Sequence, residues 1–256
     1  MEEIPDSHPR KASLMSRQRM VEASKRGLLA ESAMIAHGRG EAFDYLLGER
    51  TSDSAASAIR EAAARLLVAD SPVISMNGNS TVLAGSEAIM IASILGCPVE
   101  VNIYYRTSER MEALISELET LRGRLGRESS GMTSESIMGV EILGSVADGR
   151  IQGLEGPRSM CSSRGIEQAD LVLVPLEDGD RCEALISLGK QVIAIDLNPL
   201  SRTSKTATVT IVDEVSRAMG RIVEELLENP STTDWNNESA LRGALEVMSS
   251  SSLRID

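Results

Sequence analysis

Residues 170–213 read DLVLVPLEDGDRCEALISLGKQVIAIDLNPLSRTSKTATVTIVD, and this stretch decides the fold. It contains three apolar, β-branched runs, DLVLVPL, QVIAID and ATVTIVD, and a helical pattern over residues 183–188 separates the first two. Strands that alternate with helical patterns predict βαβ units, and continuous apolar strands are typical of a parallel sheet buried on both faces. The sequence therefore predicts an α/β fold.

The same alternation continues on both sides of this stretch. Further strands are predicted in PVISMNGN (72–79), VEVNIYY (99–105) and VEIL (140–143), and helices over residues 87–95, 108–123 and 215–227. The polar, Ser-rich residues 127–138 interrupt the pattern. We expect a surface loop there, with a mobile lid as the alternative.

The N-terminal part of the chain is helical in pattern, over residues 14–29, 32–47 and 55–69. Gly38 and Gly40 interrupt the second of these helices, which indicates a close approach by another backbone or a ligand. We expect a single α/β domain over residues 1–256, with a Rossmann-like, mostly parallel sheet and helices on both faces. Residues 1–50 would form an N-terminal helical extension. Residues 228–256 would form a peripheral C-terminal segment with one helix and a frayed end.

Composition excludes several classes of function. The chain has 26 basic and 38 acidic residues, for a net charge of −12. Proteins that coat nucleic acid or anionic membranes need a basic face. The chain also has only one Phe, three Tyr and one Trp, too few for a platform that stacks single-stranded bases. We expect no nucleic-acid partner and no membrane partner.

The N-terminus, MEEIPDSHPRKASL, has no apolar segment of the kind that directs secretion, and no uninterrupted apolar run approaches a membrane span. These features favour a cytoplasmic protein. Cys97, Cys161 and Cys182 are odd in number and widely spaced, so we interpret them as structural thiols. With only His8 and His37 in the chain, a site that needs several histidine ligands is almost excluded.

Polar clusters follow three of the predicted strands. They are Met76-Asn77-Gly78-Asn79, the run from Leu176 to Arg181, and the run from Asp196 to Thr203. Ligands of parallel α/β sheets bind outside the carboxyl ends of the strands. The sequence therefore predicts a polar ligand pocket at this edge. It contains no GxxxxGK[ST], GxGxxG or GxSxG motif and no identifiable Ser-His-Asp triad, so covalent catalysis is not indicated.

Asp178-Gly179-Asp180-Arg181 opens a helix after a predicted strand and has two interpretations. One is ordinary N-capping of the helix by an aspartate. The other is a site for a phosphate and Mg²⁺, since Asp178 and Asp180 beside Glu177 supply the carboxylate oxygens that Mg²⁺ prefers. Both interpretations stay open.

Asp196-Leu197-Asn198, followed by Ser201-Arg202-Thr203-Ser204-Lys205, favours nucleotide binding. An acid at a strand end can hold a ribose hydroxyl, and Arg and Thr just beyond it can reach phosphate oxygens. The alternative is a polar connection between strands, with Pro199 as a turn marker.

His37-Gly38-Arg39-Gly40-Glu41 combines a titratable ring, a guanidinium and two glycines. The preceding arm is locally basic, and Arg17 and Arg39 are its best candidates for phosphate contacts. This assignment assumes that the two side chains converge in space.

Together these clusters resemble the archaeal phosphopantothenate synthetases, the 4-phosphopantoate:β-alanine ligases. The resemblance covers the chain up to about Leu227, without the Ser-rich segment and the C-terminal tail. It rests on the following residues: Ile4-Pro5, Ser7-His8-Pro9-Arg10, Ser13-Leu14, Arg17, AHGRGEAFDYLLGE (36–49), PVISMNGN, VEVNIYYRT, ADLVLVPLEDGDR, IDLNPLSRT and ATVTIVD.

The resemblance implies an ATP-dependent ligase of coenzyme A biosynthesis that joins 4-phosphopantoate to β-alanine and releases AMP and diphosphate. An acyl-adenylate is the expected intermediate, because a carboxylate is a poor electrophile. The resemblance further implies a homodimer with a Rossmann-like core, and Mg²⁺ beside the phosphates. The HxGH motif of bacterial pantothenate synthetases is not matched by residues 37–40, so unphosphorylated pantoate should be a poor substrate.

The resemblance also implies a set of nucleotide contacts. Carried over by motif, they are Arg17, Arg39, Asp196, Leu197, Asn198, Arg202, Thr203, Glu214 and Val215. The family usually has Asn where this sequence has Glu214, a change that only a backbone contact would survive. Because aromatic residues are scarce, we expect aliphatic side chains and backbone groups, rather than a stacked ring, to hold the adenine.

For the acid substrate, charge and position near strand ends suggest Arg158, Arg106 and Lys205. His37 could accept the proton of the β-alanine ammonium, or it could be a structural hydrogen-bonding residue. Two other functions remain as alternatives: an ATP-dependent small-molecule kinase that releases ADP, and a non-catalytic dimer that senses nucleotides.

Overall fold

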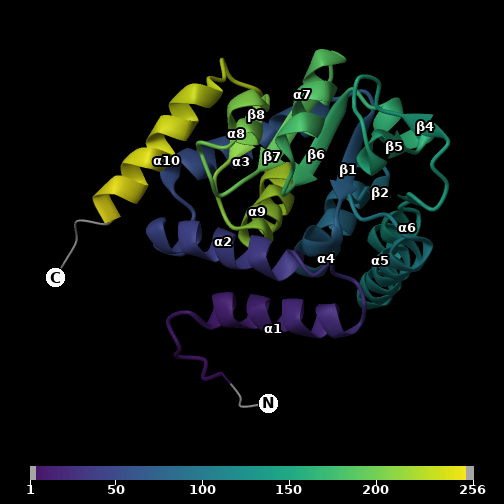
Figure 1. Cartoon of the computed structure of the whole chain (residues 1–256), viewed down its shortest axis with the longest axis horizontal. Helices are drawn as coiled ribbons and strands as arrows, with labels where there is room; N and C mark the ends of the chain where they lie inside the picture. The colour runs from purple at the N-terminus through teal and green to yellow at the C-terminus, as the bar shows by residue number, and fades with distance from the viewer. Residues whose placement is uncertain (1–3, 252–256) are drawn as a thin grey trace.

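Within residues 4–251, which the computed structural model describes, six parallel strands form a sheet in the order β3-β2-β1-β6-β7-β8 (Figure 1). The strands are β1 (Pro72–Met76), β2 (Val99–Val101), β3 (Ile142–Leu143), β6 (Leu171–Pro175), β7 (Gln191–Ile195) and β8 (Val209–Ile211). Every neighbouring pair in this sheet is parallel. The predicted α/β fold with a mostly parallel sheet is confirmed.

The strand order reverses between β1 and β6. From β1 the chain moves outward through β2 to β3, then crosses back to β6 and continues outward through β7 to β8. The connections that leave β1 and β6 therefore diverge, and they leave a crevice at the carboxyl ends of these two strands. This topology places the residues after β1 and β6 at the expected position of a ligand.

Alternate residues of each strand pack against opposite layers of helices. In β6, Leu171 and Leu173 belong to the larger apolar core, whereas Val172 and Val174 belong to a second core with Leu185 of α7. The larger core takes in α3 (Asp53–Val68), α4 (Gly78–Leu95), α5 (Ser108–Glu128) and α9 (Val215–Glu228), and the second includes α7 (Gly179–Ser187). Helices cover both faces, as predicted.

The N-terminal extension consists of α1 (Lys11–Lys25) and α2 (Ala33–Leu46), which lie along one end of the molecule in Figure 1. Met20 of α1 and Leu28, just after it, are almost completely buried in the larger core. The extension is therefore packed against the sheet domain. α2 continues through both of its glycines as one helix.

Residues 127–138 are helical except at Ser129 and Ser130, so the prediction of a loop was wrong, although most of the segment is exposed. α5 runs to Glu128, and α6 (Gly131–Met138) follows it. A Cβ at Gly126 would lie 2.6 Å from the sulfur of Met138, so the two helices approach closely where the chain has no side chain. Ile137 is 3% exposed. The segment is mostly polar, so its composition did not indicate this contact, which involves only Ile137 and Met138 at its end.

Smaller elements complete the fold. β4 (Gly149–Arg150) and β5 (Met160–Cys161) form an antiparallel pair that the sequence did not predict, next to the short helices η1 (Pro157–Ser159) and η2 (Ser163–Glu167). α8 (Arg202–Thr206) connects β7 to β8. The predicted C-terminal helix is present as α10 (Asn237–Ser251), and the predicted frayed end, residues 252–256, lies outside the described residues.

α4 is long and apolar enough to span a membrane by length and composition, with a mean hydropathy of 1.2. More than half of it is buried within the protein, and it packs against α5 and α9. Its apolar composition is therefore explained by its place in the core.

The three cysteines are free and buried. Burial raises the pKa of each thiol to about 12, so the reactive thiolate is rare at neutral pH. This agrees with their interpretation as structural thiols.

Glu61 of α3 anchors the C-terminal segment. Its Oε2 accepts hydrogen bonds from the backbone N and the Oγ1 of Thr233, both at 2.8 Å, and its Oε1 accepts one from Arg65 at 2.7 Å. We expect Glu61→Ala to lower the free energy of unfolding by about 2 kcal/mol, because the protein loses three hydrogen bonds to a buried carboxylate. Chemical denaturation measures the loss. The exposed Glu224→Ala on α9 is the control, and equal losses in both variants would contradict the prediction.

Candidate active site

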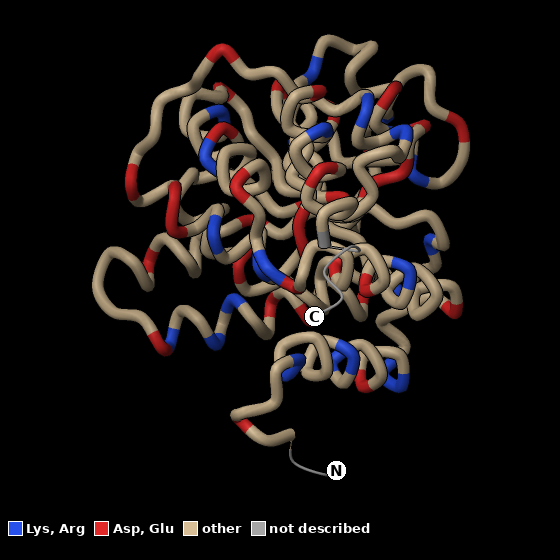
Figure 2. The backbone as a smooth tube through the Cα atoms, turned by 90° about the vertical axis from the view of Figure 1, so that its left-hand side faces the viewer, with Lys and Arg blue, Asp and Glu red and all other residues tan. Residues whose placement is uncertain are grey.

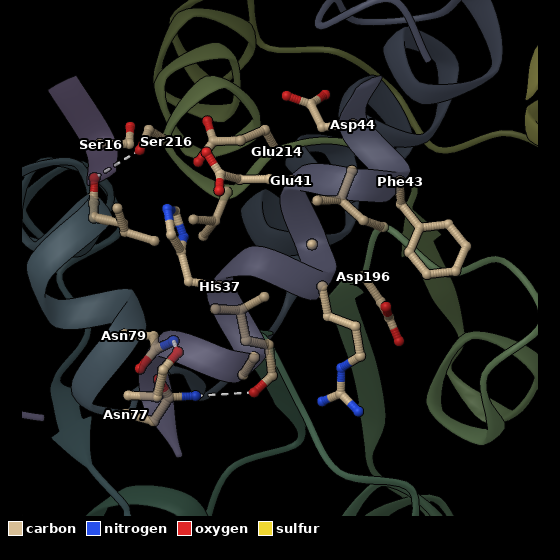
Figure 3. A pocket seen from close by; sticks show the side chains of 18 of the residues that line it. Ser16, His37, Glu41, Phe43, Asp44, Asn77, Asn79, Asp196, Glu214 and Ser216 are labelled. Carbon is tan, nitrogen blue, oxygen red and sulfur yellow. Dashed lines mark hydrogen bonds between the residues drawn. The ribbon is translucent and has the colours of Figure 1, made fainter. Parts of the chain in front are cut away.

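A cavity of about 1080 Å³ lies at the carboxyl ends of the parallel strands. Residues after β1, β2, β6, β7 and β8 line one side of it, and residues of α1 and α2 line the other. Figure 3 shows side chains from both sides directed into the same space. The polar strand ends therefore meet at one cavity, as the sequence predicted.

Asn77 bridges the crevice between β1 and β6. Its Nδ2 donates to the backbone oxygen of Leu176 at 2.9 Å, and its Oδ1 accepts from the backbone N of Ser80 at 3.0 Å, which caps α4. Leu176 has a φ of 62°, a left-handed conformation that is unfavourable for a residue with a side chain. The first turn of α4, with its free N–H groups and positive dipole end, is thereby held at the cavity, where it favours an anion.

Asp196 begins the loop after β7 and organises it. Its carboxylate accepts hydrogen bonds from the backbone N of Asn198, at 2.9 Å, and from the hydroxyl of Ser201. Burial raises the pKa of Asp196, and these hydrogen bonds counteract the rise by stabilising the carboxylate. The loop is therefore shaped around one half-buried acid that lines the cavity.

Gly40 allows α2 to lie close to this loop. A Cβ at Gly40 would sit 3.4 Å from Leu197 Cδ1, in van der Waals contact. Leu197 in turn packs in a cluster with Leu47 and with Leu241 of α10. The close approach predicted from the glycines of α2 is present at Gly40, whereas a Cβ at Gly38 would have nothing within 4 Å.

His37 projects from α2 toward the same part of the cavity as Glu41 and Glu214 (Figure 3). Burial lowers the pKa of its imidazole below the usual 6.5, although the two carboxylates act in the opposite direction. Its Nε2 is buried and has no hydrogen-bond partner among the residues that the structure describes. A lowered pKa favours the neutral imidazole at neutral pH, and within residues 4–251 its Nε2 is left without a hydrogen-bond partner at the cavity.

Arg217 of α9 connects α2 to the end of β8. It donates to Asp44 of α2 at 2.6 Å, and its Nε donates to Asp213 at 2.9 Å. Asp213 also accepts a hydrogen bond from Thr51 at 2.7 Å. This partly buried network fixes α2 over the strand ends and sets the position of Glu214, the N-cap of α9.

Most of the residues predicted for the site line the cavity. They are His37, Arg39, Arg158, Asp196, Leu197, Asn198, Arg202, Thr203, Glu214 and Val215.

Five other candidates lie outside this lining: Arg17, Arg106, Asp178, Asp180 and Lys205. Arg17 donates to Glu41, which does line the cavity, at 2.9 Å. Arg106 donates to the backbone oxygen of Gly144 at 2.7 Å. Lys205 is exposed on α8.

Asp178 and Asp180 do not fit a magnesium site. Asp178 accepts from the backbone N of Arg181 at 2.9 Å, so its interpretation as the N-cap of α7 is confirmed, and it also pairs with Arg158 at 2.5 Å. Asp180 pairs with Arg202 at 2.5 Å. Within residues 4–251, no group of three or more His, Cys, Asp or Glu side chains could hold a metal ion.

Sequence reasoning missed several cations of the cavity. Arg10, Arg19, Arg110 and Arg217 all line it. Arg110 follows β2 as the other clusters follow their strands, so the same signal could have found it. Arg10 and Arg19 do not follow a strand, and it is the packing of the basic α1 region (Figure 2) against α4 and α2 that brings them to the cavity.

Phe43, Tyr104 and Tyr105 also line the cavity, and the two tyrosine rings form an edge-to-face pair with centroids 5.1 Å apart. Three of the five aromatic residues of the chain thus gather at one place. The scarcity of aromatic residues in the whole chain therefore gives no reason to expect adenine to bind without a stacked ring.

The family model for phosphopantothenate/pantothenate synthetase matches residues 54–250, more than half of the chain. The chain belongs to this family. A relative from Thermococcus kodakarensis is 45% identical over 94% of the chain and 86% of its own length. One from Methanosarcina mazei is 46% identical, over 88% and 82%, and one from Methanospirillum hungatei is 44% identical, over 96% and 96%. All three relatives carry the name 4-phosphopantoate–β-alanine ligase.

Substitution of Asn77 separates two roles of this residue in the synthetase-family protein: its cap on α4 and its hydrogen bond across the crevice to Leu176. Asn77→Asp keeps the oxygen that caps α4 but cannot donate to Leu176, and it places a negative charge at the cavity. We expect the free energy of unfolding of this variant to lie within about 1 kcal/mol of that of the unsubstituted protein. We also expect it to lose most of the thermal stabilisation given by diphosphate, used as an anion probe.

In the matched variant, Asn77→Ala, the cap is lost as well, so stability should fall by about 1 kcal/mol further. If Asn77→Asp keeps the full response to diphosphate in a thermal-shift titration, the crevice is not the anion site.

Proposed function

We propose that this protein is an ATP-dependent ligase that condenses (R)-4-phosphopantoate with β-alanine to 4′-phosphopantothenate in coenzyme A biosynthesis, with release of AMP and diphosphate. The observation that carries the proposal is the 44–46% identity to relatives named for this reaction, over 88–96% of the chain. The position of the cavity supports it, because nucleotides bind at a reversal of strand order in such sheets.

The reaction would proceed in two displacements. First, a carboxylate oxygen of phosphopantoate attacks the α-phosphorus of ATP, and the bond from that phosphorus to diphosphate breaks. The amine nitrogen of β-alanine then attacks the acyl carbon, the bond to AMP breaks, and the amine proton passes to a base. No protein nucleophile is required, so the protein acts by positioning and by neutralising charge.

The nucleotide would lie along the ends of β7 and β8. The Asp196 carboxylate would bind ribose, and Glu214 and Val215 would contact the nucleotide through the start of α9. Arg39 and Arg202 line the cavity and would reach phosphate oxygens. Mg²⁺ would enter bound to ATP, as part of the substrate.

Three further candidates would act less directly. Thr203 lines the cavity beside Arg202, and its hydroxyl already donates to the backbone oxygen of Glu177 at 3.2 Å. Arg17 would act through Glu41, its hydrogen-bond partner, and Lys205 would need to swing in from the surface of α8.

Phosphopantoate would lie at the end of β6, with its phosphate on Arg158. This side chain is almost fully buried and lines the cavity, so its charge is weakly screened. The cavity volume of about 1080 Å³ is sufficient for a nucleotide together with a small acid.

We also propose that the protein is cytoplasmic and forms a homodimer. The interface would be formed by the N-terminal helices α1 and α2 of each copy. Val21 of α1 and Ile35 and Tyr45 of α2 are large apolar side chains that lie outside the cavity lining, with exposed fractions of 40%, 72% and 64%. Apolar side chains that gather on one exposed surface are typical of a protein interface. Sedimentation or light scattering of the protein measures its mass directly.

One product assay distinguishes the proposed function from its alternatives. The protein is incubated with ATP, Mg²⁺, 4-phosphopantoate and β-alanine. Control reactions omit 4-phosphopantoate or β-alanine in turn. We expect AMP only when both are present. ADP as the product would instead indicate a kinase, and tight nucleotide binding without turnover would indicate a sensor.

His37 should produce an acid limb in the pH profile. Burial lowers its pKa below 6.5, so the neutral ring that accepts the amine proton persists at neutral pH and is lost as the pH falls through the lowered pKa. We expect kcat/KM for β-alanine to decline as the pH falls through this lowered pKa. We expect His37→Gln to reduce kcat by about 100-fold and to remove this decline. If His37→Gln keeps the wild-type rate and pH profile, His37 has a structural role and not a catalytic one.

A further inference from the structure

Two guanidinium groups share one carboxylate oxygen beside the cavity. Arg158 Nη2 and Arg181 Nη1 both donate to Glu177 Oε2, at 3.0 and 2.6 Å. The side chains of Arg181 and Glu177 are fully buried, and that of Arg158 is 9% exposed. Two buried positive charges therefore meet one buried negative charge.

Arg181 is held behind the cavity wall by the fold itself. It lies in α7, and its Nη2 donates to the hydroxyl of Ser75 in β1 at 2.8 Å, across the reversal of strand order. It does not line the cavity, so it does not touch a ligand there. The next buried carboxylate, Glu100, accepts hydrogen bonds from the backbone N–H groups of Ser162 and Ile166.

Arg158 retains donors for a ligand. Its Nε donates to Asn102 at 3.1 Å, its Nη1 to Asp178 at 2.5 Å and its Nη2 to Glu177. A guanidinium has five N–H donors, so two remain beyond these three hydrogen bonds. Asp178 is 45% exposed, and water screens its charge more than that of Glu177.

We propose that Arg181 is a positioning residue that neutralises Glu177, so that Arg158 keeps its charge and its two free donors for the phosphate of the acid substrate. Without Arg181, the buried Glu177 would pair with Arg158 alone and cancel its charge. Arg181 would thus determine the selection of a phosphorylated acid over its unphosphorylated form, without contact to either. This inference rests on the proposed function.

The physical basis is the cost of an unbalanced buried charge. Burying a cation in protein is unfavourable unless an anion lies beside it. The shared carboxylate leaves the buried trio of Arg158, Glu177 and Arg181 with one positive charge in excess, which the half-exposed Asp178 offsets only in part. A phosphate dianion at Arg158 relieves this excess, whereas the hydroxyl of an unphosphorylated acid does not.

The test compares Arg181→Met with the double variant Arg181→Met/Glu177→Gln. In the single variant, kcat/KM for 4-phosphopantoate relative to pantoate should fall by about 10- to 100-fold, because Glu177 then cancels Arg158. KM for ATP should stay within about twofold, because the nucleotide lies along β7 and β8. In the double variant Arg158 is again uncancelled, so at least about tenfold of the lost selectivity should return.

Arg164→Met is the matched control, because this arginine is 69% exposed and pairs with Glu141 away from the cavity. It should leave the selectivity unchanged. Two results overturn the proposal: wild-type selectivity in Arg181→Met, or a double variant as unselective as the single one. The second result would show a merely structural role for Arg181, which removal of Glu177 cannot repair.

A binding measurement keeps this inference separate from the proposed function. The thermal shift produced by 4-phosphopantoate, and by inorganic phosphate as a simpler probe, should shrink in Arg181→Met and recover in the double variant. If the wild-type protein forms no AMP, the proposed function fails. The thermal shifts still decide whether Arg181 controls a phosphate site.

Discussion

The reversal of strand order between β1 and β6 is the constraint on which the rest of the site depends. It leaves two neighbouring strand ends whose following connections diverge, and Asn77 spans them while it caps α4. The unfavourable backbone of Leu176 is held at this place by the hydrogen bond from Asn77. Helices α1 and α2 line the cavity on the side opposite the strand ends and so cover the crevice.

The cavity is rich in arginine although the protein as a whole is acidic. Arg10 pairs with Glu49, and Arg217 pairs with Asp44, so carboxylates hold cavity arginines in defined positions. Such pairing limits the cost of partly burying a cation and keeps each guanidinium directed. The net charge of −12 therefore describes the chain as a whole, and the distribution within the cavity decides what it can bind.

The fold and the strand-end part of the site were predictable from local sequence, because alternating apolar runs and polar strand ends are properties of short segments. Asp196 and Asn77 belong to this class. What failed depended on contacts between distant segments. The helix over residues 131–138 depends on the closeness of Met138 to Gly126. Whether an arginine of α1 reaches the cavity depends on the rotation of that helix, which places Arg19 at the cavity and Arg17 outside it.

The two ends of the cavity differ in how their arginines are neutralised, and this difference orients the proposed substrates. Arg202, at the β7 end, is 60% exposed and pairs with Asp180 and Glu183, so water and two full carboxylates already satisfy it. A phosphate of ATP at Arg202 would replace one of these solvated partners, so its net gain there would be smaller than at a buried arginine. At the β6 end, Arg158 also has two carboxylate partners, but it shares the buried Glu177 with Arg181, and its other partner, Asp178, is half-exposed. An added anion there would therefore meet a buried guanidinium that is less completely neutralised. Under the proposed function, the phosphate of the acid would therefore bind at the β6 end, and the hydrogen-bonding groups of the nucleoside would bind at the β7 end.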